Sequence, residues 1–241
     1  MIVEDNPTKI LVVGTGRSGT NHFASVCQNL NVDVGHEEMK SEGISSWCLV
    51  SDQPEAPYGP SLQELNSNEF VIGHQLRNPM KTIPSLMTIN KESWAFIRDD
   101  ADGRIPMKWW NRAPLRVKAM WHWLDWNQRA EEMAEIHWTL DSASELGSIL
   151  ADALERPELE EKWEAEWTSE NVHTNDAQSR IIGLHRIWGT SPIVAYRRWR
   201  HARGHYPATE EALFEADPTL ARDIMQFWRE FVKNLDLPTK K

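Results

Sequence analysis

The chain has 241 residues, which is enough for one large α/β domain with a sizeable buried core. Its formal net charge of -10 argues against a general affinity for nucleic acids, whose phosphates would be repelled. Two cysteines are too few for a disulfide framework, and no secretion signal or apolar run near the roughly 20 residues that cross a bilayer is present, so we expect a soluble, cytoplasmic protein without a membrane span.

Strand and helix patterns alternate along the first 150 residues. A continuous apolar run, KILVVG at 9–14, predicts a buried parallel strand, and the helical spacing after it predicts a helix over 18–30. Further elements are predicted as a strand over 32–37, a loop with a short helix over 51–68, a strand over 70–76, a loop over 98–113, a helix over 115–136 and a strand over 135–140. This alternation predicts a three-layer α/β fold in which helices flank a central parallel sheet.

Capping residues predict where several helices begin. Asn78-Pro79 is a typical helix start, and Pro84 is expected to kink or end the helix that follows. Ser142 and Glu145 form a predicted capping box. From residue 207 onward the pattern is helical and is interrupted at Asp217-Pro218.

The domain organisation expected from these patterns is one domain over residues 1–241. Its core spans 9–150, and its C-terminal part, 151–241, is helical and rich in tryptophan. The whole chain carries 13 tryptophans, most of which we expect in the core or in cleft walls.

The stretch from Gly14 to Thr20 reads GTGRSGT and lies between a predicted strand and a predicted helix, the context of a phosphate-binding loop. Glycines let successive backbone N–H groups point at an anion, and the helix N-terminus adds the positive end of its dipole. Arg17 adds a cation, and Ser18 and Thr20 add hydroxyl donors. The lysine that follows the last glycine in nucleoside triphosphatases is replaced here by Thr20.

Two other interpretations of this stretch stay open. It is also compatible with a tight strand-to-helix turn that binds nothing. Gly14, Gly16 and Gly19 match the G-x-G-x-x-G pattern of dinucleotide-binding proteins as well, although Arg17 and Ser18 are unusual there and no acid follows the second strand at the spacing needed for ribose binding.

A second pattern follows the predicted strand at 70–76. Arg77 and Ser85 are eight residues apart, with Asn78-Pro79 between them. Arginine offers a planar fork to a phosphate, and the serine adds a hydroxyl from the flank of the helix. In the alternative interpretation, Arg77 is a surface arginine that forms an ion pair, and Ser85 is a helical serine that binds no ligand.

Three candidate bases follow the second predicted strand, at the sheet edge where the glycine-rich stretch is also expected. A carboxylate beside a desolvated cleft has a raised pKa and is a usable general base near neutral pH. The candidates for this base are His36, Glu37 and Glu38. The three residues are also compatible with a solvated turn or with a metal site, for which no further ligand cluster is visible in the sequence.

GRSGT after the first strand, together with the R-x-P turn at Arg77 and the serine two helical turns later, resembles the sulfotransferases that use 3'-phosphoadenosine 5'-phosphosulfate (PAPS). The resemblance covers roughly residues 9–145 and implies a P-loop-like fold. It implies that Arg77 and Ser85 bind the 3'-phosphate and that Glu37 is the base, with His36 and then Glu38 as the alternatives. No metal is expected, because Arg17 and the loop amides already supply a positive field. The residues implied in gripping the 5'-phosphosulfate are Gly16, Arg17, Ser18, Gly19, Thr20 and Asn21.

The function that this resemblance implies is the in-line transfer of a sulfuryl group from PAPS to a hydroxyl of a small acceptor, with Arg17 stabilising the departing phosphate. In the family a late basic loop covers the nucleotide, and its nearest analogue here is Arg203-Gly204 in the basic tract at 180–206. Trp47 or Trp188 is expected to stack on the adenine.

Two further functions remain as alternatives. One is a nucleotide-dependent kinase, for which Asp141 offers a Mg²⁺ ligand, although that residue equally suits a helix cap. The other is a nucleotide-binding protein with no turnover.

Overall fold

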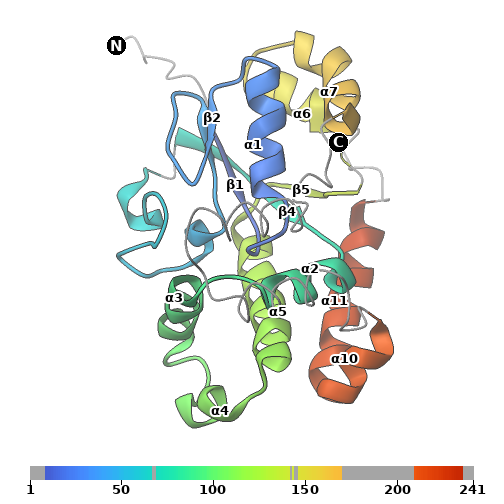
Figure 1. Cartoon of the computed structure of the whole chain (residues 1–241). Coiled ribbons are helices and arrows are strands. Elements are labelled where there is room, and N and C mark those ends of the chain that lie inside the picture. The colour runs from blue at the N-terminus through green and yellow to red at the C-terminus, as the bar shows by residue number, and fades with distance from the viewer. Residues whose placement is uncertain (1–8, 67–68, 142, 144–145, 170–208, 236–241) are drawn as a thin grey trace, which may run out of the picture. The chain divides into compact units, whose positions relative to one another are not determined.

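The computed structural model describes residues 9–66, 69–141, 143, 146–169 and 209–235 (Figure 1). The chain divides into two compact units. The sheet unit, as we call the first, comprises residues 1–77, 125–170 and 234–241, and the helical unit comprises residues 78–124 and 171–233. The predicted capping box at Ser142 and Glu145 and the basic tract at 180–206 lie outside the described residues.

Five parallel strands in the order β2-β3-β1-β4-β5 form the sheet. They are β1 (Lys9–Val13), β2 (Val34–His36), β3 (Gly43–Ser45), β4 (Phe70–Leu76) and β5 (Ile136–Thr139). The central place of β1 explains its apolar run, because residues 10–13 have no exposed surface. The sequence patterns miss β3, since three residues beginning with glycine give no apolar run.

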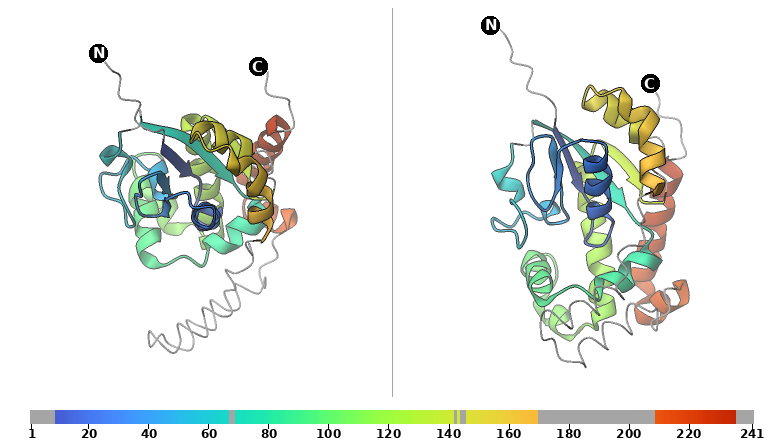
Figure 2. Two further views of the ribbon diagram at one scale, coloured as in Figure 1. Left: turned by 90° about the horizontal axis from the view of Figure 1, so that it is seen from above. Right: turned by 45° about the horizontal axis from the view of Figure 1, so that its top comes forward.

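The helices of the sheet unit are α1 (Thr20–Asn29), α6 (Leu146–Ala153), α7 (Glu158–Ser169) and the second half of α5 (Leu115–Met133). Figure 2 shows α1 beside β1 and β4. Phe23 of α1 packs between Trp138 of β5 and Trp163 of α7, with ring centroids 5.6 and 5.7 Å away. Together with the helices near the C-terminus, these elements confirm the predicted α/β fold with a central parallel sheet flanked by helices.

In its described part the helical unit consists of α2 (Pro79–Leu86), α3 (Lys91–Ala101), α4 (Met107–Arg112), the first half of α5, α10 (Glu210–Ala216) and most of α11 (Pro218–Leu235). Asn78 caps α2, because its Oδ1 accepts a hydrogen bond of 2.8 Å from the Met80 N–H. This helix continues through Pro84 and ends two residues later. Trp123 of α5 is fully buried and lies 6.0 Å from the ring of Phe227 in α11.

The predicted loop over 98–113 is wrong. The end of α3 and the whole of α4 lie in this stretch, and Trp110 of α4 is buried, with its ring 6.2 Å from that of Trp94. The polar composition hides these helices, because their stability comes from packing rather than from a long apolar face.

No helix in the described ranges is long and apolar enough to cross a membrane.

The strand order has a topological switch point between β1 and β4. The chain leaves β1 toward β2 on one side and leaves β4 toward β5 on the other, although β1 and β4 are neighbours. Ligands of α/β sheets commonly bind outside the carboxyl ends of the strands at such a switch point.

Gly43 of β3 is a position at which we predict that the sheet does not tolerate a side chain. Its φ is +146°, and a Cβ there would lie 2.0 Å from the carbonyl oxygen of Ile10 in the neighbouring strand. We expect Gly43→Ala to lower the free energy of unfolding by about 2–4 kcal/mol, measured by urea denaturation.

Gly103→Ala is the matched control for this substitution. Gly103 also has a positive φ, +85°, but no heavy atom lies within 4 Å of a Cβ built on it. Its substitution should cost only the backbone strain of about 1 kcal/mol. Equal losses for the two variants would contradict a clash at Gly43.

Candidate functional site

The segment 14–19, which we call the glycine loop, follows the carboxyl end of β1 and lies against the end of β4. The register pairs Val13 with His74, so Gly14 comes to lie against Gln75, and a Cβ on Gly14 would be 2.4 Å from the Gln75 carbonyl oxygen. The Gln75 side chain donates from Nε2 to the carbonyl oxygen of Ser18 at 2.9 Å. Only glycine therefore fits at position 14, and β4 holds the loop from one side.

Arg77 makes the second contact between β4 and the glycine loop. Its Nη1 donates to the carbonyl oxygen of Arg17 at 3.1 Å. The two arginines, which are 60 residues apart in the chain, are thus joined at the carboxyl ends of β1 and β4. Arg17 is exposed and Arg77 is half-buried.

The backbone of the loop adopts left-handed conformations at two residues. φ is +70° at Arg17 and +106° at Gly19. A Cβ on Gly19 would lie 2.6 Å from Gln75 Nε2 and 2.8 Å from Leu140 Cδ1, so a side chain has no room there. Arg17 is not a glycine, so its positive φ strains the backbone, and such strain often occurs at ligand-binding sites.

Helix α1 begins at the end of this loop without a side-chain cap. Gly19 is the N-cap residue and provides no side-chain cap hydrogen bond, and the first turn carries no acidic residue. The N–H groups of a first turn have no partner within the helix, and the helix dipole makes this end positive. The arrangement suits an anion at the start of α1.

Three buried hydroxyls lie at the same sheet edge. Thr15 and Ser18 belong to the loop, and Ser45 ends β3 beside Val12 of β1. All three residues are fully buried, and their hydroxyl oxygens have no hydrogen-bond partner among the described residues. An unsatisfied buried hydroxyl costs about 1–3 kcal/mol, so a polar ligand at this edge would recover part of that free energy.

The three candidate bases have different surroundings. His36 ends β2, and its Nε2 lies 3.2 Å from Thr20 Oγ1 at the start of α1. Glu37 is partly buried and accepts a hydrogen bond of 3.0 Å from Trp47 Nε1. Glu38 is 68% exposed and pairs with Lys40 at 3.1 Å. His36 thus contacts the start of α1 and Glu37 contacts the buried Trp47, whereas Glu38 lies at the surface.

Burial shifts the pKa of two groups at the site. It raises the pKa of Glu37 above its ordinary value, and the Trp47 hydrogen bond and the charge of Arg17 partly oppose this shift. It lowers the pKa of Arg77 below its ordinary value, against the effect of the nearby Asp141 carboxylate. A guanidinium that is partly removed from water attracts an anion more strongly than one in bulk solvent.

The remaining predicted residues lie in different places. Gly16 is buried in the glycine loop, and Thr20 is buried at the start of α1. Asn21 is exposed in the first turn of that helix. Ser85 is half-buried in α2 and belongs to the helical unit, so it is not part of the geometry described for the sheet unit. The candidates Trp188 and Arg203-Gly204 lie outside the described residues.

Trp47 is a core residue rather than a surface on which a base can stack. It is 6% exposed, its ring lies 5.8 Å from that of Trp126, and its carbonyl oxygen accepts a hydrogen bond of 2.7 Å from Trp126 Nε1. The structure therefore does not support the expected stacking of adenine on Trp47.

Sequence reasoning missed Gln75, whose side chain contacts the glycine loop. The available signal is a polar residue one position before the end of the apolar strand FVIGHQL, at the edge where the loop was expected. Its amide group is used twice, because Oε1 also accepts a hydrogen bond of 3.2 Å from Trp138 Nε1.

No protein-family model matches the chain, and searches of curated proteins and of solved structures found no match either.

The raised pKa of Glu37 predicts how stability depends on pH. The folded state favours the protonated carboxyl, so the stabilising contribution is present below the ordinary glutamate pKa and is lost as pH rises through the folded value. Glutamine mimics the protonated form. We expect Glu37→Gln to be more stable than the wild type near pH 7, with the difference shrinking toward about pH 4, in thermal unfolding at each pH.

Glu38→Gln is the control for charge alone. It removes the same negative charge from the adjacent, exposed position. An equal gain in both variants would mean that the net charge, and not the burial of Glu37, is responsible.

Proposed function

We propose that the protein is a sulfotransferase that moves a sulfuryl group from PAPS to a hydroxyl of a small acceptor. The observation that carries this proposal is the hydrogen bond from Arg77 to the Arg17 carbonyl oxygen, which joins two cationic residues at the switch point between β1 and β4. A nucleotide with separate anionic groups on its 3' and 5' sides needs two such anchors within the reach of one molecule.

The donor set of the glycine loop fits the 5' end of PAPS. Arg17, the uncapped first turn of α1 and the hydroxyls of Thr15 and Ser18 offer a cation, backbone N–H groups and buried donors. In the proposal Gly16, Gly19, Thr20 and Asn21 complete this cradle, and Arg77 takes the 3'-phosphate. Fixed donors of this kind stabilise charge that develops on a leaving group.

PAPS supplies a sulfuryl group attached to a phosphate that leaves readily. In the proposed step the acceptor oxygen forms a bond to sulfur while the bond from sulfur to the 5'-phosphate oxygen breaks. Glu37 takes the proton of the acceptor hydroxyl, and its raised pKa makes it a stronger base than an exposed carboxylate. His36, whose Nε2 lies 3.2 Å from Thr20 Oγ1, is the alternative proton acceptor.

A nucleotide-dependent kinase is the second candidate function. Asp141 follows β5 at the same sheet edge, and its carboxylate is close enough to affect the pKa of Arg77. A carboxylate in such a place is a possible Mg²⁺ ligand. This alternative requires Mg²⁺ and a preference for ADP or ATP.

Calorimetry distinguishes the two functions. We expect 3',5'-adenosine bisphosphate to bind in the micromolar range, about -8 kcal/mol, and ADP with Mg²⁺ to bind more weakly. Arg77→Ala should weaken binding of the bisphosphate by about 1.5–3 kcal/mol, because it removes a charge-assisted hydrogen bond. Equal affinity for the two nucleotides, or unchanged affinity in the variant, would contradict the sulfotransferase proposal.

Arg156→Ala is the matched control in that titration. Arg156 pairs with Glu42 at 3.3 Å and donates to the Asn31 carbonyl oxygen at 2.8 Å, beyond the C-terminal end of α1. This end is about 15 Å from the glycine loop, given the rise of a 10-residue helix. The control should keep the wild-type affinity for the bisphosphate.

A transfer assay tests the role of Glu37. With ³⁵S-labelled PAPS and the class of phenol or sugar hydroxyl that the wild type modifies, Glu37→Gln should lower the rate by about 10²–10⁴-fold and leave the affinity for 3',5'-adenosine bisphosphate unchanged. Glu38→Gln should keep most of the activity. A full rate in Glu37→Gln would exclude it as the base and leave His36 for the same test.

A further inference from the structure

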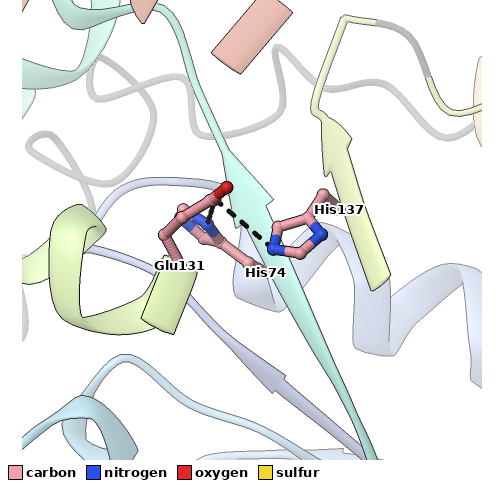
Figure 3. A group of neighbouring side chains, drawn as sticks. All are labelled: His74, Glu131 and His137. Carbon is pink, nitrogen blue, oxygen red and sulfur yellow. Dashed lines mark hydrogen bonds and ion pairs between the residues drawn. The ribbon is translucent and has the colours of Figure 1, made fainter. Parts of the chain in front are cut away.

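Three potential metal ligands converge in the sheet unit, away from the glycine loop. They are His74 of β4, His137 of β5 and Glu131 of α5 (Figure 3). One carboxylate oxygen, Glu131 Oε2, lies 3.1 Å from His74 Nδ1 and 3.4 Å from His137 Nε2. The three ligand atoms all lie within 4.8 Å of one another.

The sheet register brings the two histidines together. His74 pairs with His137, and the next pair along the strands is Gln75 with Trp138. Trp138 packs against Phe23 of α1, and side chains alternate between the faces of a sheet. The histidine pair therefore projects from the face opposite α1, where the second half of α5 supplies Glu131.

The short connection between α5 and β5 fixes the third ligand. Helix α5 ends at Met133 and β5 begins at Ile136, so Glu131 in the last helical turn is six residues from His137. The Glu135 N–H donates to the Ile72 carbonyl oxygen at 2.8 Å, which ties this connection to β4. The ligands thus lie on three packed elements rather than on a surface loop.

Asn127 orients the buried histidine. It lies one helical turn before Glu131, and its Oδ1 is 3.1 Å from His74 Nε2, a bond in which the imidazole donates. His74 Nδ1 is the ring nitrogen that faces the Glu131 carboxylate, so a proton or a metal ion between these two atoms joins them. Metal-binding histidines are commonly oriented by such a hydrogen bond from the other ring nitrogen.

We propose that His74 Nδ1, His137 Nε2 and the Glu131 carboxylate bind one divalent transition-metal ion of the Zn²⁺ class. Ligand atoms 2.0–2.1 Å from a tetrahedral zinc ion are about 3.4 Å apart, which agrees with the observed 3.1 and 3.4 Å. Imidazole nitrogen with one carboxylate suits Zn²⁺, whereas Mg²⁺ prefers oxygen ligands. Glu131 and His137 are 36% and 27% exposed, so water can reach a fourth position.

Such an ion would act as a structural clamp. It would connect the edge strand β5 to β4 and to the last turn of α5, joining residues that are 57 and 6 positions apart in the chain. Metal that binds only the folded state raises the unfolding temperature by mass action. The clamp is independent of the proposed sulfuryl transfer, since it lies on the other face of the sheet.

Zinc titration of the chelator-treated full chain tests the site. We expect one equivalent of Zn²⁺ to bind with a micromolar or lower Kd and to raise the unfolding temperature, while Mg²⁺ does neither. His137→Ala and Glu131→Gln should each weaken Zn²⁺ binding by more than about 10-fold. Glu132→Gln, an exposed neighbour on the same helix, should bind Zn²⁺ like the wild type. No binding, or equal binding in all variants, would overturn the proposal.

Histidine ¹⁵N spectra of the wild type give a second readout that does not depend on how the variants fold. Zn²⁺ should shift the resonances of His74 Nδ1 and His137 Nε2, assigned in the wild type from through-bond correlations. If Zn²⁺ binds but moves other histidine resonances instead, the ion is held elsewhere and the proposed site is wrong.

Discussion

The parallel pairing of β1 with β4 is the constraint on which the rest of the sheet unit depends. Its register sets Gly14 against the carbonyl of Gln75, so the chain must turn after β1 without a side chain at that position. The turn is then held by hydrogen bonds from Gln75 and Arg77 to two successive carbonyl groups, those of Ser18 and Arg17. With its carbonyls engaged in this way, the loop leads into α1 with the first-turn N–H groups uncapped.

Strand β4 serves both faces of the sheet. Gln75 supports the glycine loop and the face that carries α1, and its neighbour His74 points to the opposite face and to α5. Because side chains alternate along a strand, the adjacent residues His74 and Gln75 make these two sets of contacts on opposite faces of the sheet. A change that shifted the register of β4 by one residue would therefore exchange these faces and disturb the glycine loop and the histidine cluster together.

Local patterns in the sequence were sufficient for the glycine loop, the strands around it and the cap at Asn78, because each depends on a few adjacent residues. They were insufficient for β3 and α4, which are too short for a periodic signal and are held by neighbours distant in the chain. The sequence also placed Trp47 among the candidates for base stacking, whereas Glu37 and Trp126 hold it in the core. Whether a tryptophan ring is exposed and free to stack on a base depends on tertiary packing.

By itself the sequence determined a parallel α/β sheet, a glycine-rich loop between β1 and α1, and an arginine that follows β4. Only the tertiary structure decided that Arg77 reaches the loop, that Glu37 is buried while Glu38 is not, and that His74, Glu131 and His137 meet. The physical reason is that these relations depend on strand register and on the facing of helices. Both are set by contacts between residues many positions apart, to which no local spacing corresponds.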